Sequence, residues 1–234
     1  MHPNADPEVI AWWVRHPQSI AIERNTYLGD SELSKKGEKQ IHPLVQEICR
    51  LEPDLILCSP MIRTTKVAFA DTTYLLQIEP ALSEWPRIPE MVGRLNADPV
   101  VEDYLEGRMR RFVNGEMLPS EEPRDETVQR MLQIEAGLRE IGLRLKIRLK
   151  RAGRIVIISH GNRGRQFQAW LKAKGDIDRF VEEFLDSYER DGLEPAAIMP
   201  PFWYGKFFRK GIPGWNRELG YSSYLSRQLR DSEI

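Results

Sequence analysis

Cysteine is scarce in this sequence, which has only two among its 234 residues, Cys49 and Cys58. One falls on a predicted helix and the other inside a predicted strand, and their spacing fits neither a disulfide framework nor a metal-binding pattern. We therefore expect a protein of a reducing, cytoplasmic compartment. No apolar run approaches the roughly 18 residues that a membrane-spanning helix needs, so we expect no membrane partner. The opening MHPNADPEVI also lacks the basic region and long apolar core of a secretory signal.

A surplus of either charge is also missing, since the formal net charge at pH 7 is −1. Bulk electrostatics therefore give no reason to expect a nucleic acid partner. The sequence has no aspartate-rich cluster that would bind a metal ion, no internal repeat and no low-complexity tract. With 41% hydrophobic residues and no break in composition, we interpret residues 1–234 as a single α/β domain.

The segment at residues 11–19, AWWVRHPQS, is an apolar run that stops abruptly at Arg15 and His16. Its Trp and Val content and its closing Pro are typical of a buried strand that opens into a loop. Open α/β sheets bind ligands at the carboxyl ends of their strands, and the planar guanidinium of arginine suits phosphate. The pair therefore marks a candidate site, although standing alone it would fit a salt bridge and a structural histidine equally well.

Later segments repeat this arrangement. The run at residues 55–63 predicts a strand, a turn and a helix with Arg63 in its first turn. The run IVIISH at residues 155–160 predicts a strand that ends in His160, and Glu84 lies between the two in a loop after an apolar segment. Because the carboxyl ends of parallel strands share one edge of a sheet, we expect the side chains to converge. The candidate site consists of Arg15, His16, Arg63, Glu84 and His160.

Helical periodicity separates these strands. Residues 34–51 place apolar side chains on one face, with Ser34 as the predicted N-cap and Pro43 predicting a kink or a late start. Residues 125–151 predict a long amphipathic helix, although its last part, LRLKIRLK, also alternates as a strand would. Strands that alternate with helices predict parallel pairing. Further helices are expected from Pro60 to Ala70, at 163–174 and from Ile177 to near Gly192, and a further strand at 72–78.

Five short patterns, taken in order, carry a resemblance to a known family. They are Arg15-His16, Leu33-Ser34-x-x-Gly37-x-x-Gln40, Ser59-Pro60-x-x-Arg63-Thr64, Glu84 and Ser159-His160-Gly161. Together they resemble the histidine phosphatase superfamily, in its phosphoglycerate mutase-like branch, across about residues 10–172. The tail from Gly214 to Leu225 is similar to the family's closing Trp-Asn segment. The resemblance implies a three-layer α/β/α sandwich with a mostly parallel central sheet, in which residues 85–125 form a lid-like insertion that sets substrate choice.

The same resemblance implies hydrolysis of a small-molecule phosphomonoester through a phosphohistidine. His16 would be the nucleophile, as the first histidine is in the family. Arg15, Arg63 and a protonated His160 would surround the phosphoryl oxygens with positive charge, so we expect neither a metal nor a cofactor. Glu84 would give a proton to the leaving oxygen and later take one from water. Weaker predictions for substrate contacts are Gln18, Ser19, Asn25, Gly161 and Asn162.

Two positions depart from the family pattern. Pro17 stands where the family has a glycine after the nucleophile, which deletes an N–H and stiffens the loop. It keeps the carbonyl that, in relatives, orients the imidazole. The family's asparagine a few residues further on has no equivalent at the expected offset, and Asn25 is the candidate substitute.

Three alternatives stay open at this point. A cofactor-dependent phosphoglycerate mutase is disfavoured because Trp85-Pro86-Arg87 follows Glu84 where mutases carry an Arg-His-Tyr-Gly run. A phosphate-recognising binding module without turnover would not need the complete set of catalytic residue types. An RNA-binding protein would use the aromatic and basic side chains of residues 193–234 to stack bases. We interpret that segment instead as one that docks on the body of the protein or on a second copy in a homodimer.

Overall fold

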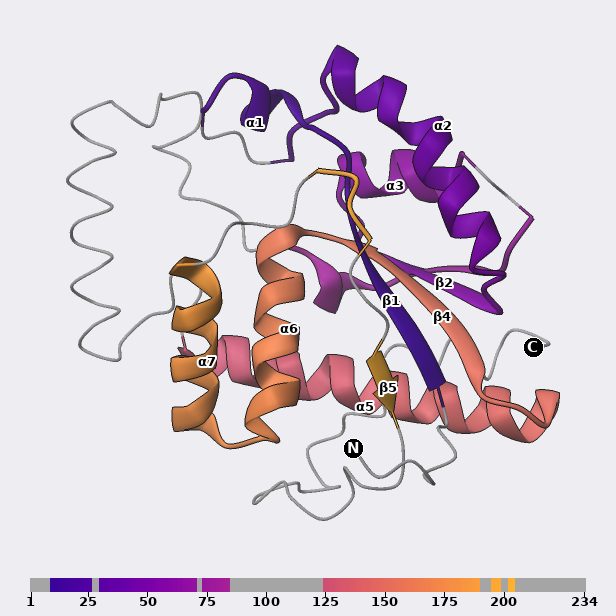
Figure 1. Ribbon diagram of the computed structural model, residues 1–234, viewed down its shortest axis with the longest axis vertical. Coiled ribbons are helices and arrows are strands. Elements are labelled where there is room, and N and C mark those ends of the chain that lie inside the picture. The colour runs from indigo at the N-terminus through magenta and orange to yellow at the C-terminus, as the bar shows by residue number, and fades with distance from the viewer. Residues whose placement is uncertain are drawn as a thin grey trace.

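A five-stranded sheet in the order β3-β2-β4-β1-β5 forms the centre of the molecule (Figure 1). The computed structural model describes residues 9–26, 30–70, 73–84, 124–189, 195–198 and 202–204. The strands are β1 Val9–Arg15, β2 Leu55–Cys58, β3 Leu76–Ile78, β4 Gly153–Ser159 and β5 Phe202–Tyr204. The first four pair in parallel, and β5 pairs antiparallel to β1. The predicted mostly parallel sheet is therefore confirmed.

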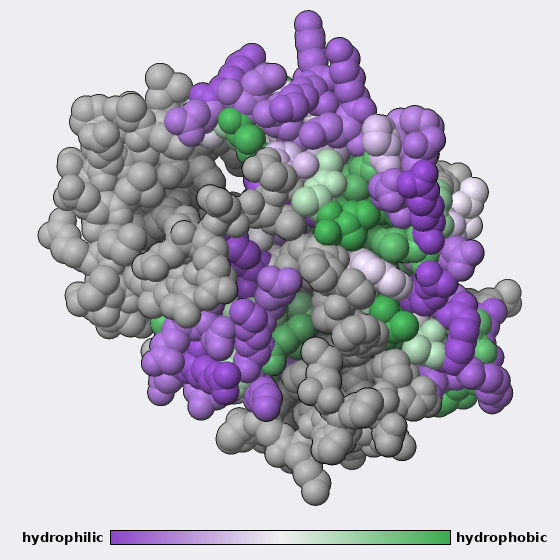
Figure 2. Space-filling model, viewed as in Figure 1, coloured by the Kyte–Doolittle hydropathy of each residue, from purple (hydrophilic) through white to green (hydrophobic). Residues whose placement is uncertain are grey.

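Helices cover both faces of this sheet, which confirms the predicted three-layer α/β/α sandwich. They are α1 Ile20–Glu23, α2 Lys35–Arg50, α3 Ile62–Ala68, the 3₁₀ turn η1 Pro80–Leu82, α5 Arg124–Leu149, α6 Gly161–Ala173 and α7 Ile177–Glu189. Figure 1 shows α2 and α3 on one side of the sheet and α5, α6 and α7 on the other. Successive side chains of β1 enter opposite cores, since Trp13 packs with Phe167 and Val14 packs with Leu44. Hydrophilic residues cover the outward sides of α2 and α7 (Figure 2).

Helix α2 begins where the sequence predicts. The Ser34 hydroxyl accepts a hydrogen bond from the Gly37 N–H across 3.1 Å, so Ser34 is the N-cap. Pro43 lies inside the helix, which still begins at Lys35, so the predicted late start is wrong. The ring of Pro43 is on the exposed side, and packing of the opposite face against the sheet offsets the one backbone hydrogen bond that proline removes.

The ambiguous segment LRLKIRLK is helical, because it forms the end of the 26-residue helix α5. Met131, Ile134 and Leu138 recur at helical spacing on the face of α5 that packs on the sheet, and each is at most 2% exposed. The strand alternative is wrong because the buried stripe of this longer helix continues through Ile141 and Leu145 into the segment.

Several elements differ from the sequence-based predictions. The segment after the candidate nucleophile, predicted as a loop, contains the short helix α1, whose N-cap is Ser19. Helix α3 is two residues shorter at each end than the predicted Pro60 to Ala70. Strand β3 begins at Leu76, so residues 73–75 lie outside it, because β2, its partner among the described residues, is four residues long. Helix α6 begins at Gly161, two residues earlier than expected, so His160 is its N-cap.

Part of the predicted organisation lies outside the described residues, namely most of the lid-like insertion at 85–125 and the tail from 205 onward. Within the described part of residues 193–234, β5 pairs with β1, and Ile198 bridges Val14. The described helices include none that is both long enough and apolar enough to cross a membrane.

Candidate active site

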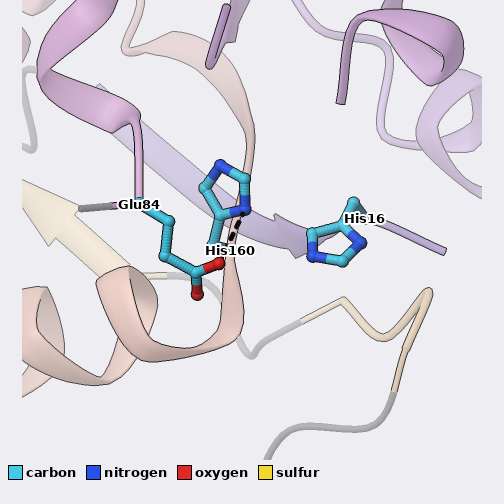
Figure 3. A group of neighbouring side chains, drawn as sticks. All are labelled: His16, Glu84 and His160. Atoms are coloured by element: carbon cyan, nitrogen blue, oxygen red, sulfur yellow. Dashed lines mark ion pairs between the residues drawn. The ribbon is translucent and has the colours of Figure 1, made fainter. Parts of the chain in front are cut away.

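The two candidate histidines lie side by side, because β1 and β4 are adjacent parallel strands in register. Arg15 pairs with Ser159 at the carboxyl ends of these strands, and the residue after each is a histidine. The backbone N–H of His16 donates to the Ser159 carbonyl across 3.0 Å, and the ring centroids of His16 and His160 are 5.2 Å apart. Figure 3 shows both rings with the Glu84 side chain next to them. The topology thus brings together residues far apart in the sequence.

His16 is fixed in one tautomer by its two hydrogen bonds. Its Nδ1 lies 2.6 Å from the Pro17 carbonyl, which can only accept, so Nδ1 carries the proton. Its Nε2 accepts from the Nε–H of Arg63 across 3.2 Å. Burial is the main cause that lowers the pKa of His16 to about 3, and the Arg63 cation adds to the effect. The ring is therefore neutral at pH 7, with the lone pair on Nε2.

Arg63 connects the groups of the site. It lies in the first turn of α3 and is buried, and its Nη2 donates to Oε2 of Glu84 across 2.9 Å. On its other side, Nη1 lies 3.5 Å from Oδ1 of Asp30. The Asp30 carboxylate also accepts from the backbone N–H of Ile62, at 2.9 and 3.2 Å. Two carboxylates, those of Glu84 and Asp30, therefore hold the guanidinium against the imidazole of His16.

His160 is completely buried, with Ser59 on one side of its ring and Glu84 on the other. The Ser59 hydroxyl lies 2.9 Å from Nε2, and Oε2 of Glu84 lies 3.6 Å from Nδ1 (Figure 3). Burial lowers the pKa of His160 well below its ordinary value of 6.5, although the Glu84 carboxylate opposes the shift. At pH 7 the ring is neutral in this structure, whereas the sequence-based expectation was a protonated ring. A phosphate dianion beside it would raise its proton affinity.

Glu84 and the two histidines offer a set of atoms that suits a metal ion. One ligand atom from each of His16, Glu84 and His160 lies within 4.8 Å of the others. Arg63, however, donates to Nε2 of His16 and to Oε2 of Glu84. The guanidinium thus already places a positive charge against two of the three groups, and this electrostatic arrangement suits an anion better than a second cation.

Arg15 is the last residue of β1, and its side chain lies against the start of α6. A Cβ at Gly161 would be 3.2 Å from both Cδ and Nε of Arg15, so a larger residue there would push the Arg15 side chain by a few tenths of an ångström. Residues 196 and 197, which follow α7 in the sequence, bind the backbone on both sides of the His16 side chain. The Arg15 N–H donates to the Ala197 carbonyl across 3.0 Å, and the Ala196 N–H donates to the His16 carbonyl across 3.1 Å.

The predicted substrate contacts mostly have protein partners. The Gln18 side chain accepts from the Ser34 hydroxyl, and its backbone N–H donates to Gln40. Ser19 caps α1, and Asn162 accepts from Arg165 across 2.9 Å. Asn25 is exposed at the end of α1, where it adopts a left-handed conformation with φ of 50°. Gly161, one of these five, lies directly against Arg15 of the candidate catalytic set.

Three residues of the site were not among the predicted site residues. Ser59 belongs to the quoted pattern Ser59-Pro60, so its place at the end of β2 was a usable signal. The other two are Asp30, which contacts Arg63, and Arg163, which donates to the Ser83 carbonyl next to Glu84. No signal in the sequence pointed to these contacts, because the partners are 33 and 80 positions away.

Comparison with known proteins gives one match to a family and several matches to solved structures. The family model described as the histidine phosphatase superfamily (branch 1) matches residues 11–181. A search of curated protein sequences found no match.

Several solved structures share the fold. A mycobacterial glucosyl-3-phosphoglycerate phosphatase is 19% identical, with a TM-score of 0.61, covering 81% of this chain and 90% of that one. An alpha-ribazole phosphatase from Shigella flexneri is 19% identical, with a TM-score of 0.57 and coverage of 89% and 100%. A phosphoserine phosphatase from Entamoeba histolytica is 16% identical, with a TM-score of 0.56 and coverage of 83% and 94%.

Proposed function

Because the chain belongs to the histidine phosphatase superfamily, branch 1, we propose that it is a metal-independent phosphatase that hydrolyses phosphomonoesters through a phosphohistidine on His16. The observation that carries this proposal is the protonation and hydrogen bonding of the His16 ring. Its Nδ1 proton is bound to the Pro17 carbonyl, so the Nε2 lone pair faces the guanidinium of Arg63. A phosphoryl group held by that guanidinium would lie next to the attacking nitrogen.

In the first step, the hydrogen bond donated by the Nε–H of Arg63 passes from His16 Nε2 to a phosphoryl oxygen. The freed lone pair of Nε2 forms a bond to phosphorus while the bond from phosphorus to the ester oxygen breaks. The electron pair of that bond goes to the ester oxygen, which takes a proton from the carboxylic acid of Glu84 and leaves as an alcohol. Protonation of this kind contributes about a hundredfold to ten-thousandfold in rate. The phosphate of the substrate competes with Glu84 for Arg63, and this frees the carboxyl group to carry the proton.

In the second step, the Glu84 carboxylate takes a proton from water as the water oxygen attacks phosphorus. The phosphorus–nitrogen bond breaks, and its electron pair returns to Nε2. Arg15 and Arg63 balance the charge on the equatorial oxygens through both steps, and His160 adds its charge once the phosphate dianion has raised the proton affinity of its ring. Formation and then cleavage of a nitrogen–phosphorus bond thus replace one difficult attack by water on the ester.

Phosphatase activity is favoured over the mutase alternative because the three structural neighbours above are phosphatases. A mutase must also protect its phosphoenzyme from water. The names of these neighbours point to small phosphorylated metabolites as the substrate class, and a panel of sugar phosphates, phosphoglycerates, phosphoserine and nucleotides covers it.

The experiment is hydrolysis of p-nitrophenyl phosphate by the purified protein, compared with His16→Ala and with His42→Ala as a matched control. His42 is an exposed histidine on α2 whose ring contacts Gln46. We expect His42→Ala to retain activity and His16→Ala to lose it. Rapid acid-free quenching with a ³²P-labelled substrate should trap an acid-labile, base-stable phosphoenzyme in the wild type only. Full activity of His16→Ala would overturn the proposal.

A further inference from the structure

A second buried guanidinium, that of Arg163, binds the backbone next to the candidate proton donor, Glu84. Arg163 occupies the first turn of α6, three residues after His160, and is only 1% exposed. The first turn of a helix favours anions over cations, and a buried arginine needs good partners to offset its loss of hydration. Its presence here therefore calls for an explanation in terms of what it binds.

The donors of Arg163 converge on the backbone just before Glu84. Its Nε and Nη2 both donate to the Ser83 carbonyl, at 3.1 and 2.9 Å, and its Nη1 donates to Oε1 of Gln166 across 2.7 Å. The preceding carbonyl, that of Leu82, accepts from the Ser159 hydroxyl across 2.7 Å. Ser159 and Arg163, which lie close to His160 in the sequence, thus donate to two consecutive carbonyls, those of Leu82 and Ser83, just before Glu84.

Glu84 needs such contacts to hold it in place, because the short element next to it in the sequence does little to fix its position. The element before it, η1, has only three residues, and the Glu84 side chain is 30% exposed. Its oxygen must nevertheless lie near both His160 and the leaving group, and a misplacement of about 1 Å in such geometry can cost about a hundredfold in rate.

We propose that Arg163 is a positioning residue, which holds the Ser83–Glu84 backbone against α6 so that the Glu84 carboxyl group is placed to protonate the leaving oxygen. This inference rests on the proposed function. The cation of Arg163 also helps to lower the pKa of His160, so its charge is felt at the site. Its Nε and Nη2 donate directly to the Ser83 carbonyl, next to Glu84, and its Nη1 donates to Gln166.

The dependence of the rate on the leaving group distinguishes this role from a purely structural one. The p-nitrophenolate ion leaves without needing a proton, whereas the alkoxide of an alkyl phosphate needs one. We would measure kcat/KM, which reports on formation of the phosphoenzyme, for p-nitrophenyl phosphate and for glycerol phosphate. The proteins are the wild type, Arg163→Gln, Glu84→Gln as the reference for a lost proton donor, and Arg179→Gln as an exposed control on α7.

We expect Arg163→Gln to lose about thirtyfold to a hundredfold on glycerol phosphate and less than about threefold on p-nitrophenyl phosphate, following the pattern of Glu84→Gln. Arg163→Lys, with one donor point in place of a fork, should recover only part of the loss. Equal losses on both substrates would overturn the inference and leave the proposed function standing. Absence of hydrolysis by the wild type would overturn both.

A second variant covers the case in which Arg163→Gln does not fold. Ser159→Ala removes the other carbonyl contact, that to Leu82, and keeps the Arg163 charge. Its activity should fall more on glycerol phosphate than on p-nitrophenyl phosphate, and a uniform change would count against the inference.

Discussion

Arg63 donates from its Nε to Nε2 of His16 across 3.2 Å, so a cation lies directly against the nitrogen that we propose attacks phosphorus. The same guanidinium reaches Glu84 through Nη2, across 2.9 Å. Arginine can serve both groups because its donors are arranged in a rigid fork, whereas lysine presents one flexible point. The arrangement therefore depends on the shape of the cation as well as on its charge.

Replacing Arg63 by lysine tests that dependence. We expect Arg63→Lys to lower kcat/KM for p-nitrophenyl phosphate by on the order of a hundredfold, even though the charge is kept. Arg151→Lys is the matched control, since Arg151 forms an exposed ion pair with Asp54. Steady-state kinetics on both variants would check this, and a loss of only a few fold in Arg63→Lys would mean that charge alone is sufficient.

Pro17→Gly restores the residue that relatives carry after the nucleophile. Because the carbonyl that binds Nδ1 of His16 belongs to residue 17 in either case, we expect kcat/KM to stay within a few fold of the wild type. The free energy of unfolding should fall by about 0.4–1 kcal/mol, since glycine gains entropy in the unfolded chain. Urea titration and p-nitrophenyl phosphate hydrolysis measure the two effects. Complete inactivation would show that the proline ring, and not only the carbonyl, orients the imidazole.

Gly37→Ala should destabilise the protein. A Cβ at Gly37 would lie 1.9 Å from the carbonyl oxygen of Gln18, which is backbone and cannot rotate away. The N-terminus of α2 or the loop after His16 would have to move, at a cost of about 1–3 kcal/mol. Lys36→Ala, an exposed substitution in the same helical turn, is the control. Urea denaturation should give a lower midpoint for Gly37→Ala alone, and equal midpoints would contradict the tight contact.

Stability should fall as the pH falls from about 6.5 towards 3. In the folded protein the pKa of His16 is lowered to about 3, while the unfolded chain takes up the proton near 6.5. Between these values the unfolded state binds more protons, so one such histidine lowers the free energy of unfolding by about 1.4 kcal/mol per pH unit. His160, whose pKa is also lowered by burial, adds to the slope.

Urea unfolding at a series of pH values measures this slope. We expect His16→Ala to flatten it, whatever its stability at pH 7, and His42→Ala to leave it unchanged. An unaltered slope in His16→Ala would mean that His16 takes up its proton in the folded state.

The sequence was sufficient to predict those helix caps and strands whose cause lies within a few residues. The hydroxyl of Ser34 caps its own helix three residues on, and the apolar runs before Arg15 and His160 form the two strands that end at the site. The order of strands and helices then places both histidines at one sheet edge, because parallel strands present their carboxyl ends together.

The sequence could not predict what depends on distant partners. Strand β3 is short because its partner β2 is short, although residues 72–75 have the β-branched and aromatic character of a strand. The family resemblance made Gln18 a candidate substrate contact, and the structure adds bonds to Ser34 and Gln40, which lie 16 and 22 positions away in the sequence. The environment of His160 is equally non-local, since burial by the whole fold decides the state of its ring.

Residues 195–198 hold the backbone on either side of His16, through Ala196 and Ala197. On the ribosome, His16 is synthesised early, and these contacts become available only after nearly all the other described elements have been made. A chain synthesised only as far as α7 therefore lacks the contacts that hold His16, and acquisition of activity should require synthesis to extend past residue 198.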